Sequence, residues 1–194
     1  PFYATAPAAQ SFNDDLEAVA AMGVTVIEPC QVAVLVDAGA AKVRSGDVRF
    51  PELLRALVLV GESRDVDGCA LAVQDHGHAG PGVSDRMFRF QKMAEQMARS
   101  RHLADFFYGR DEIPAHFTRM RAAARLMSER VPLVVSDTGP AALWGASPVA
   151  STTPCLVVNF GNNHTLMGAV DGETVDGLFE HHTSMLDPTK MEGY

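Results

Sequence analysis

The sequence predicts an α/β protein with a partly parallel sheet, and two observations lead to that class. Short apolar or β-branched runs alternate with longer stretches whose apolar residues recur at helical spacing. The composition, 47% hydrophobic and 21% charged over 194 residues, is that of an ordinary globular protein with enough chain for one core or two small lobes. We therefore expect a mixed sheet with flanking helices.

The individual elements follow from caps, breakers and periodicity. Short apolar runs predict the strands, at 24–27, 32–36, 69–73, 133–135, 155–159, 165–170 and 174–179, the last two joined by a turn at Asp171-Gly172. Polar caps, an early proline and apolar stripes predict the helices, at 11–23, from Phe50 onward, 86–107, 115–129 and in an alanine-rich run that ends at Ala146. Between the third and fourth helices, 108–114 is expected to be a connection.

The polar segment 148–154, which holds two prolines, is the predicted hinge. It would separate an α/β lobe at 1–147 from the start of a second lobe at 155–194. The chain begins without Met and ends soon after the predicted hairpin, so we expect a fragment of a larger two-domain protein.

Charge and cysteine usage narrow the function classes. A net charge of −8 argues against a nucleic-acid binder that works by neutralising phosphates. No apolar stretch approaches the roughly 20 residues that span a bilayer. The three cysteines, Cys30, Cys69 and Cys155, are far apart and odd in number, which favours a reducing, cytoplasmic compartment. Without a C-x-x-C pair, no iron–sulfur cluster is expected. The expected partner is a small-molecule or phosphorylated ligand.

The first candidate site is Gln74-Asp75-His76-Gly77-His78, directly after a predicted strand. Polar groups at the carboxyl edge of a sheet are placed where α/β proteins bind ligands. Asp75, His76 and His78 supply an oxygen and two nitrogens for a divalent metal, or Asp75 could orient a histidine as general base. The simpler alternative is a polar loop whose histidines satisfy backbone groups. Arg86 and Arg89, which follow closely, could hold an anion.

The second candidate site is the small-residue run from Asp137-Thr138-Gly139 to Ala146. Small residues allow a helix to pack closely on a neighbour, and Asp137 could cap that helix. Close packing with a cap, or contact with a ligand, explains the pattern equally well.

The third candidate site is the turn Asn159-Phe160-Gly161-Asn162-Asn163-His164-Thr165. Turns rich in Gly and Asn expose successive backbone N–H groups, which can cradle a phosphate. An ordinary hairpin turn is the alternative.

The fourth candidate site is Glu180-His181-His182-Thr183, at the end of the last predicted strand. On a strand, Glu180 and His182 share one face while His181 points to the other. Glu180 and His182 are therefore candidate catalytic residues with Asp75 and His76, and His182 is a candidate metal ligand; a solvated strand end is the alternative.

These motifs together resemble an uncharacterised prokaryotic family labelled "putative pyruvate formate-lyase activating enzyme". The segments that carry the resemblance, over most of the chain, are Ala72–Gly77, Arg86–Phe90, Asp137–Gly139, Gly161–Leu166 and Glu180–Thr183. The labelled activity belongs to radical enzymes with a C-x-x-x-C-x-x-C loop, and this chain has none. We therefore do not carry that activity over.

The resemblance extends distantly to the sugar-kinase/Hsp70/actin ATPase superfamily, which implies a ribonuclease-H/actin-like fold. Residues 137–146 followed by 157–170 are similar to the small-residue run and second phosphate hairpin of hydantoinase-type members. The resemblance implies ATP with Mg²⁺ as ligand, bound by Asn159, Gly161–Thr165 and Asp137–Gly139. Asn159 stands where the superfamily has an acidic residue, and an amide cannot hold a metal-bound water as a carboxylate does.

Three functions follow as expectations. The leading one is an actin-like ATPase- or kinase-type domain that binds a nucleotide or phosphorylated ligand. The second is a metal-dependent hydrolase that uses the Asp, His and Glu residues of the first and fourth sites. The third is a regulatory domain that binds its ligand without turnover, which Asn159 favours.

Overall fold

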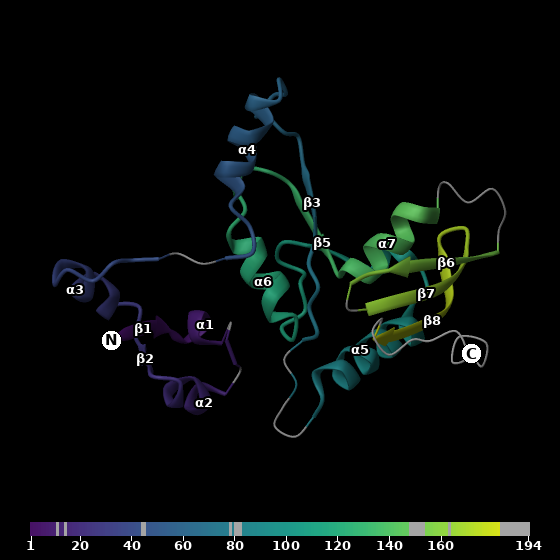
Figure 1. Cartoon of the computed structure of the whole chain (residues 1–194). Helices are drawn as coiled ribbons and strands as arrows, with labels where there is room; N and C mark the ends of the chain where they lie inside the picture. Colours follow the sequence, from purple (N-terminus) through teal and green to yellow (C-terminus); the bar gives the residue numbers. More distant parts are fainter. Residues whose placement is uncertain are drawn as a thin grey trace. The chain divides into compact units, whose positions relative to one another are not determined.

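The chain folds into two compact units, Pro1–Asp47 and Val48–Tyr194. The computed structural model describes residues 1–10, 12–13, 15–43, 46–77, 79, 83–147, 154–162 and 164–182, except the side chains of Asp85, Arg86 and His182 (Figure 1). The division after Asp47 lies within the lobe at 1–147 that the sequence suggested. Nearly all of the hinge predicted at 148–154 lies outside the described residues.

The first unit is a two-stranded parallel sheet with short helices. Its elements are β1 (Phe2–Thr5), α1 (Ala6–Ala9), α2 (Leu16–Ala21), β2 (Val24–Ile27) and α3 (Gln31–Asp37). The Asp15 side chain begins α2 by accepting the N–H of Glu17 at 2.9 Å, as an N-cap does. Val19 is fully buried, so α2 has one residue firmly in the core of this small unit.

The strand predicted at 32–36 is wrong, because these residues lie in α3. The backbone N–H of Glu28 donates to the side chain of Gln31 at 2.8 Å, a contact that starts a helical turn. Val34 and Val36 are exposed on this helix. Valine favours a strand mainly where one face of a sheet buries it, and these two side chains are not buried in that way.

The second unit contains two further sheets, and the first of them is mixed. β3 (Cys69–Ala72) pairs in parallel with β5 (Leu133–Ser136), and β4 (Phe107–Gly109) pairs antiparallel on the other side of β5. The helices α4 (Phe50–Leu59) and α6 (Thr118–Arg125) pack with this sheet into one apolar core. The core includes residues that are buried completely or nearly so: Phe50, Met120, Ala123, Leu133 and Val135.

The helix predicted at 86–107 is too long. The structure has α5 at Asp85–Arg99 and then a 3₁₀ turn, η1, at Leu103–Phe106. Between them the backbone N–H of Leu103 donates to Glu173 O, and that of Val175 donates to Arg101 O, both at 2.8 Å. Pairing with a distant strand thus ends the helix, which a local pattern cannot reveal.

Two neighbouring predictions also change. The expected connection at 108–114 contains part of strand β4, and the helix expected at 115–129 is only the eight residues of α6. β4 is recognisable only through its partner β5, since three residues carry too little periodicity to predict a strand.

The other sheet of the second unit is a three-stranded antiparallel meander. It consists of β6 (Cys155–Phe160), β7 (His164–Asp171) and β8 (Thr174–His182), in that order, which Figure 1 shows in yellow-green. The predicted hairpin at Asp171-Gly172 is confirmed, with Gly172 at a φ of +58°. Inward-facing Leu166, Val170 and Val175 form the core of this region together with Met93 of α5.

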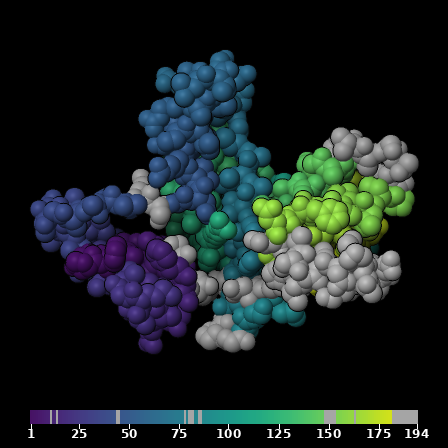
Figure 2. All heavy atoms as spheres, viewed as in Figure 1, coloured from purple at the N-terminus to yellow at the C-terminus, as the bar shows by residue number. Residues whose placement is uncertain are grey.

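Helix α7 (Thr138–Ala146) packs directly on this meander. A Cβ atom on Gly168 of β7 would lie 2.7 Å from Leu143 of α7, and one on Gly139 would lie 3.0 Å from Leu166. Figure 2 shows the green atoms of α7 against the yellow-green atoms of the meander. The small residues therefore serve the close packing that the sequence suggested.

The structure confirms a mixed α/β protein, and the residues it describes form three small sheets rather than one. Among the described residues, no helix combines the length and the apolar character needed to cross a membrane.

Candidate functional site

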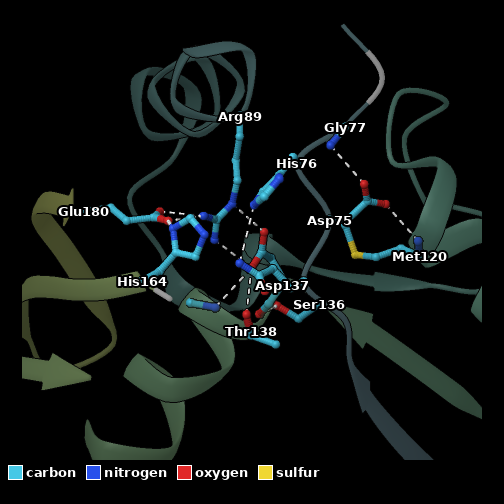
Figure 3. Close-up of polar contacts among 12 residues, drawn as sticks. Asp75, His76, Gly77, Arg89, Met120, Ser136, Asp137, Thr138, His164 and Glu180 are labelled. Carbon is cyan, nitrogen blue, oxygen red and sulfur yellow. Dashed lines mark hydrogen bonds and ion pairs between the residues drawn. The ribbon is translucent and has the colours of Figure 1, made fainter. Parts of the chain in front are cut away.

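A buried arginine lies at the centre of the candidate site. Arg89, on α5, is 4% exposed and makes a two-point ion pair with Asp137: Nε to Oδ2 and Nη2 to Oδ1, each 2.9 Å. Its Nη1 atom donates to both carboxylate oxygens of Glu180, on β8 (Figure 3). Asp137 and Glu180 are themselves 6% and 4% exposed, so the three charged side chains form a cluster that is almost entirely shielded from solvent.

The ionisation of this cluster follows from its contacts. Burial by itself lowers the pKa of Arg89, but the charge and hydrogen bonds of Asp137, and then those of Glu180, raise that pKa above its ordinary value. Arg89 is therefore a permanent cation. One cation against two carboxylates leaves the cluster with a formal charge of −1.

His164 joins this cluster from the first position of β7. Its Nδ1 atom lies 2.7 Å from Oε1 of Glu180. The ring centroid of His76 is 5.4 Å from that of His164, and the Nε2 atom of His76 lies 3.4 Å from Nε2 of Gln74. Figure 3 shows the two imidazole rings beside the guanidinium of Arg89. The first, third and fourth sequence motifs thus meet at Arg89.

A cavity of about 340 Å³ opens beside the cluster. Gln74, from the segment after β3, Asn159 and Asn162, from the β6–β7 hairpin, and Thr138, at the start of α7, contribute amide and hydroxyl groups to its walls. The walls are completed by Gly139, Gly161, Leu166, Arg89, His164 and Glu180. Most polar groups on these walls can both donate and accept hydrogen bonds, which suits a polar small molecule.

The hairpin turn differs in one respect from the phosphate cradle that the sequence suggested. The backbone N–H of Gly161 donates to His164 O at 2.9 Å, so it closes the turn and is not available to a ligand. A Cβ atom at Gly161 would lie 2.7 Å from the same oxygen, which explains why glycine is needed there. Asn162 remains at the cavity, and Asn163 lies outside the described residues.

Asp137 caps α7, as the sequence suggested. Its Oδ1 atom accepts the backbone N–H of Gly139 at 3.1 Å and the hydroxyl of Thr138 at 3.2 Å. With Arg89 on the same carboxylate, Asp137 is fully occupied by protein groups. Thr138 and Gly139, rather than Asp137, are the residues of this motif that face the cavity.

Asp75 connects two stretches of backbone and does not line the cavity. Its Oδ1 atom accepts the N–H of Gly77 at 2.9 Å, and its Oδ2 atom accepts the N–H of Met120, in α6, at 2.8 Å. The side chain is 3% exposed. Gly77 has a φ of +77°, so the motif needs glycine there to make the tight turn around Asp75. These contacts engage both carboxylate oxygens of Asp75, the residue that the sequence suggested as a catalytic group or as the orienter of a histidine.

Other expected site residues are placed less directly. Thr165 is fully buried and alternates with the cavity-facing His164 and Leu166, so it points to the opposite face of the sheet. His78, the side chain of His182 and all of Thr183 lie outside the described residues.

The described residues provide no suitable set of ligands for a metal ion or an iron–sulfur cluster. No group of three or more His, Cys, Asp or Glu side chains in that part of the chain is arranged to hold a metal ion. Cys30, Cys69 and Cys155 are free thiols on different elements, and Cys30 belongs to the other unit. The cysteines therefore do not fit an iron–sulfur cluster, and we derive no chemistry from one.

The sequence indicated Arg89 only as a residue that could hold an anion. The structure makes it the centre of the site, paired with protein carboxylates. A local signal existed: Arg89 interrupts the apolar pair Phe88 and Phe90 on a helix, and a charge at a core-facing position requires a buried partner. Nothing local indicated that the partners would be Asp137 and Glu180, which are 48 and 91 residues away.

Comparison with known proteins identifies the family. A family model described as "Putative pyruvate format-lyase activating enzyme (DUF1786)" matches residues 1–194, the whole chain, and the chain belongs to this family. Searches for similar curated proteins and similar solved structures found no match. The membership agrees with the resemblance noted from the motifs, and the description states an activity whose cysteine ligands this chain does not supply.

Proposed function

We propose that the chain binds a nucleotide or another phosphorylated small molecule in the cavity beside Arg89. The observation that carries this proposal is the convergence of segments far apart in sequence on one polar cavity. Gln74, Thr138-Gly139 and the hairpin from Asn159 to His164 all contribute to its walls. Backbone and side-chain groups that converge in this way fix the orientation of a ligand.

The order of elements around the cavity supports an actin-like form of this proposal. Helix α7 is followed by the antiparallel meander β6-β7-β8, and the β6–β7 turn faces the cavity with the start of α7. That is the arrangement expected from a small-residue run followed by a phosphate hairpin. Asn159, at the position expected to be acidic, also lines the cavity.

The charge of the cavity defines how a phosphorylated ligand would be held. Arg89 is already paired with Asp137 and Glu180, so it supplies no spare positive charge. The amide N–H groups of Asn162 and Asn159 and the hydroxyl of Thr138 would then donate to phosphate oxygens. With no carboxylate at Asn159, the Mg²⁺ ion would be held through the phosphates rather than by this residue.

Thermal-shift and calorimetric titrations test the proposal. ATP with Mg²⁺ is expected to raise the melting temperature, because a ligand that prefers the folded state stabilises it; adenosine should have little effect. Replacing the exposed Asn162 by alanine should weaken ATP binding several-fold, as loss of one hydrogen bond does. Gln91→Ala, at an exposed amide on α5, is the matched control.

The outcomes separate the three functions expected from the sequence. Equal effects of ATP and adenosine, or no effect of either, would contradict binding of a nucleotide through its phosphates. Stoichiometric transition metal in the purified protein, with no effect of ATP, would instead support the metal-dependent hydrolase. Binding of ATP without phosphate release would support a regulatory ligand-binding domain.

A further inference from the structure

Glu180 and His164 form a close carboxylate–imidazole ion pair beside the cavity. Nδ1 of His164 lies 2.7 Å from Oε1 of Glu180, and His164 lines the cavity. We propose that His164 is the general base of this site and that Glu180 is its positioning residue. The inference rests on the proposed function, since it needs a ligand in the same cavity.

The contact with Glu180 determines which nitrogen of His164 carries a proton. Both carboxylate oxygens of Glu180 accept hydrogen bonds from Nη1 of Arg89, so Glu180 acts here as an acceptor. We infer that the neutral ring of His164 carries its proton on Nδ1, the nitrogen that lies 2.7 Å from Oε1 of this acceptor. In the neutral ring, Nε2 is then the nitrogen with the lone pair, as a general base requires.

The charged groups around His164 favour acceptance of a proton. Glu180 contacts it from β8, Arg89 and Asp137 complete the cluster from α5 and the start of α7, and His76 faces it from the segment after β3. The Arg89, Asp137 and Glu180 groups sum to −1. An imidazolium on His164 would bring this buried cluster to zero, which stabilises the state formed after proton transfer.

The other candidate bases in the described part of the chain are less suited. Asp75 has each carboxylate oxygen engaged by a backbone N–H and is absent from the cavity wall. His76 contacts the amide of Gln74 and the ring of His164, and neither of these partners is a carboxylate. His164 alone among these three combines a place in the cavity wall with a bound carboxylate.

The step is a phosphoryl transfer from a nucleoside triphosphate to water or to an alcohol. The hydroxyl oxygen forms a bond to the terminal phosphorus while its proton passes to Nε2 of His164. The bond from that phosphorus to the bridging oxygen breaks, and its electron pair remains on the nucleoside diphosphate. His164 afterwards releases the proton to solvent, which restores the starting state.

The test measures phosphate release from ATP with Mg²⁺ by wild type and by His164→Gln, with binding followed by thermal shift. We expect His164→Gln to lower the rate by about 10²–10⁴-fold, the usual contribution of a general base, and to keep the ATP-induced shift. His102→Gln, at an exposed histidine outside the cavity, should release phosphate at the wild-type rate. The wild-type rate should rise with pH along the titration of His164 measured by NMR.

A second readout does not depend on any ligand. In protein with ¹⁵N-labelled histidine, neutral His164 should carry its proton on Nδ1, and Glu180→Gln should disturb that preference. A proton on Nε2 in wild type would overturn the inference whether or not ATP binds. ATP binding without phosphate release, or a rate unchanged in His164→Gln, would overturn the catalytic role while leaving the proposed function intact.

Discussion

Asp75 and Glu180 are both buried carboxylates of the second unit, and the sequence marked both as candidate catalytic residues. Asp75 is held by the backbone N–H groups of Gly77 and Met120. Glu180 is held by the side chains of Arg89 and His164. One carboxylate therefore joins two stretches of backbone, and the other belongs to a charged network at a cavity.

The contrast shows that the partners of a buried acid, more than its burial, indicate what it does. Backbone N–H groups are fixed by the fold, so a carboxylate that satisfies two of them stabilises a loop and a helix start. A carboxylate whose partners are ionised or titratable side chains belongs instead to a network that can exchange protons. Each of the following experiments tests one side of this contrast.

The largest effect is expected at the centre of the charged network. Arg89→Met leaves Asp137 and Glu180 buried without their cation, which should lower the free energy of unfolding by about 3–5 kcal/mol. Urea denaturation measures this loss. The matched control is Arg101→Met: Arg101 pairs with Asp176 at 3.3 Å with both side chains more than half exposed, and should contribute less than about 1 kcal/mol. Similar losses in both variants would contradict the buried network.

A smaller loss is expected from Asp75. Asp75→Asn keeps one acceptor oxygen and turns an amide N–H toward the second backbone donor, so the free energy of unfolding should fall by about 1–3 kcal/mol. The ATP-induced thermal shift should remain. The exposed Asp111→Asn is the control for loss of one negative charge. A folded Asp75→Asn protein whose melting temperature no longer responds to ATP would indicate that Asp75 takes part in ligand binding.

The packing that brings α7 to the network can be tested with a pair of glycines. Gly168→Ala places a Cβ atom 2.7 Å from Leu143, which is 1% exposed and has little room to move. We expect a loss of about 1–3 kcal/mol in the free energy of unfolding and weaker ATP binding. On the adjacent strand, Gly177→Ala meets no atom within 4 Å and should change stability by less than about 0.5 kcal/mol. Equal effects of the two substitutions would show that close packing of α7 is not required.

The smallest effect concerns His116, which lies next to the turn around Asp75. Its ring packs on Phe117 and Phe88, and its buried Nε2 atom has no hydrogen-bond partner among the described residues. Burial, and then the positive charge of Lys92, lower the pKa of His116 below its ordinary value. As pH falls below about 6.5, the unfolded chain binds a proton that the folded chain resists, so stability should decrease.

His116→Leu should therefore flatten the pH dependence of the free energy of unfolding between neutral pH and about pH 5. Urea midpoints across this range measure the slope, and the exposed His102→Gln serves as control. An unchanged slope in His116→Leu would show that this ring does not titrate differently in the folded chain.

The sequence allowed much of the second unit to be predicted. The runs at 69–73, 133–135 and 155–159 and the turn at Asp171-Gly172 are strong local signals, and each is a strand or turn in the structure. The helix cap at Asp137 and the close packing of the small residues after it also follow from local chemistry. The sequence did not predict α3 or the end of α5. The hydrogen bond from the Glu28 N–H to the Gln31 side chain starts α3, and α5 ends where the following residues pair with the β7–β8 region.

The sequence by itself determined the class of fold, the positions of most elements in the second unit and the four polar segments among which the candidate site lies. Only the tertiary structure decided which of their residues meet. Arg89 joins Asp137 and Glu180 across 48 and 91 residues, while Asp75, from an equally polar motif, is turned toward the backbone. The physical reason is that local propensity acts over a few residues, whereas the partner of a buried charge is chosen by the packing of the whole unit.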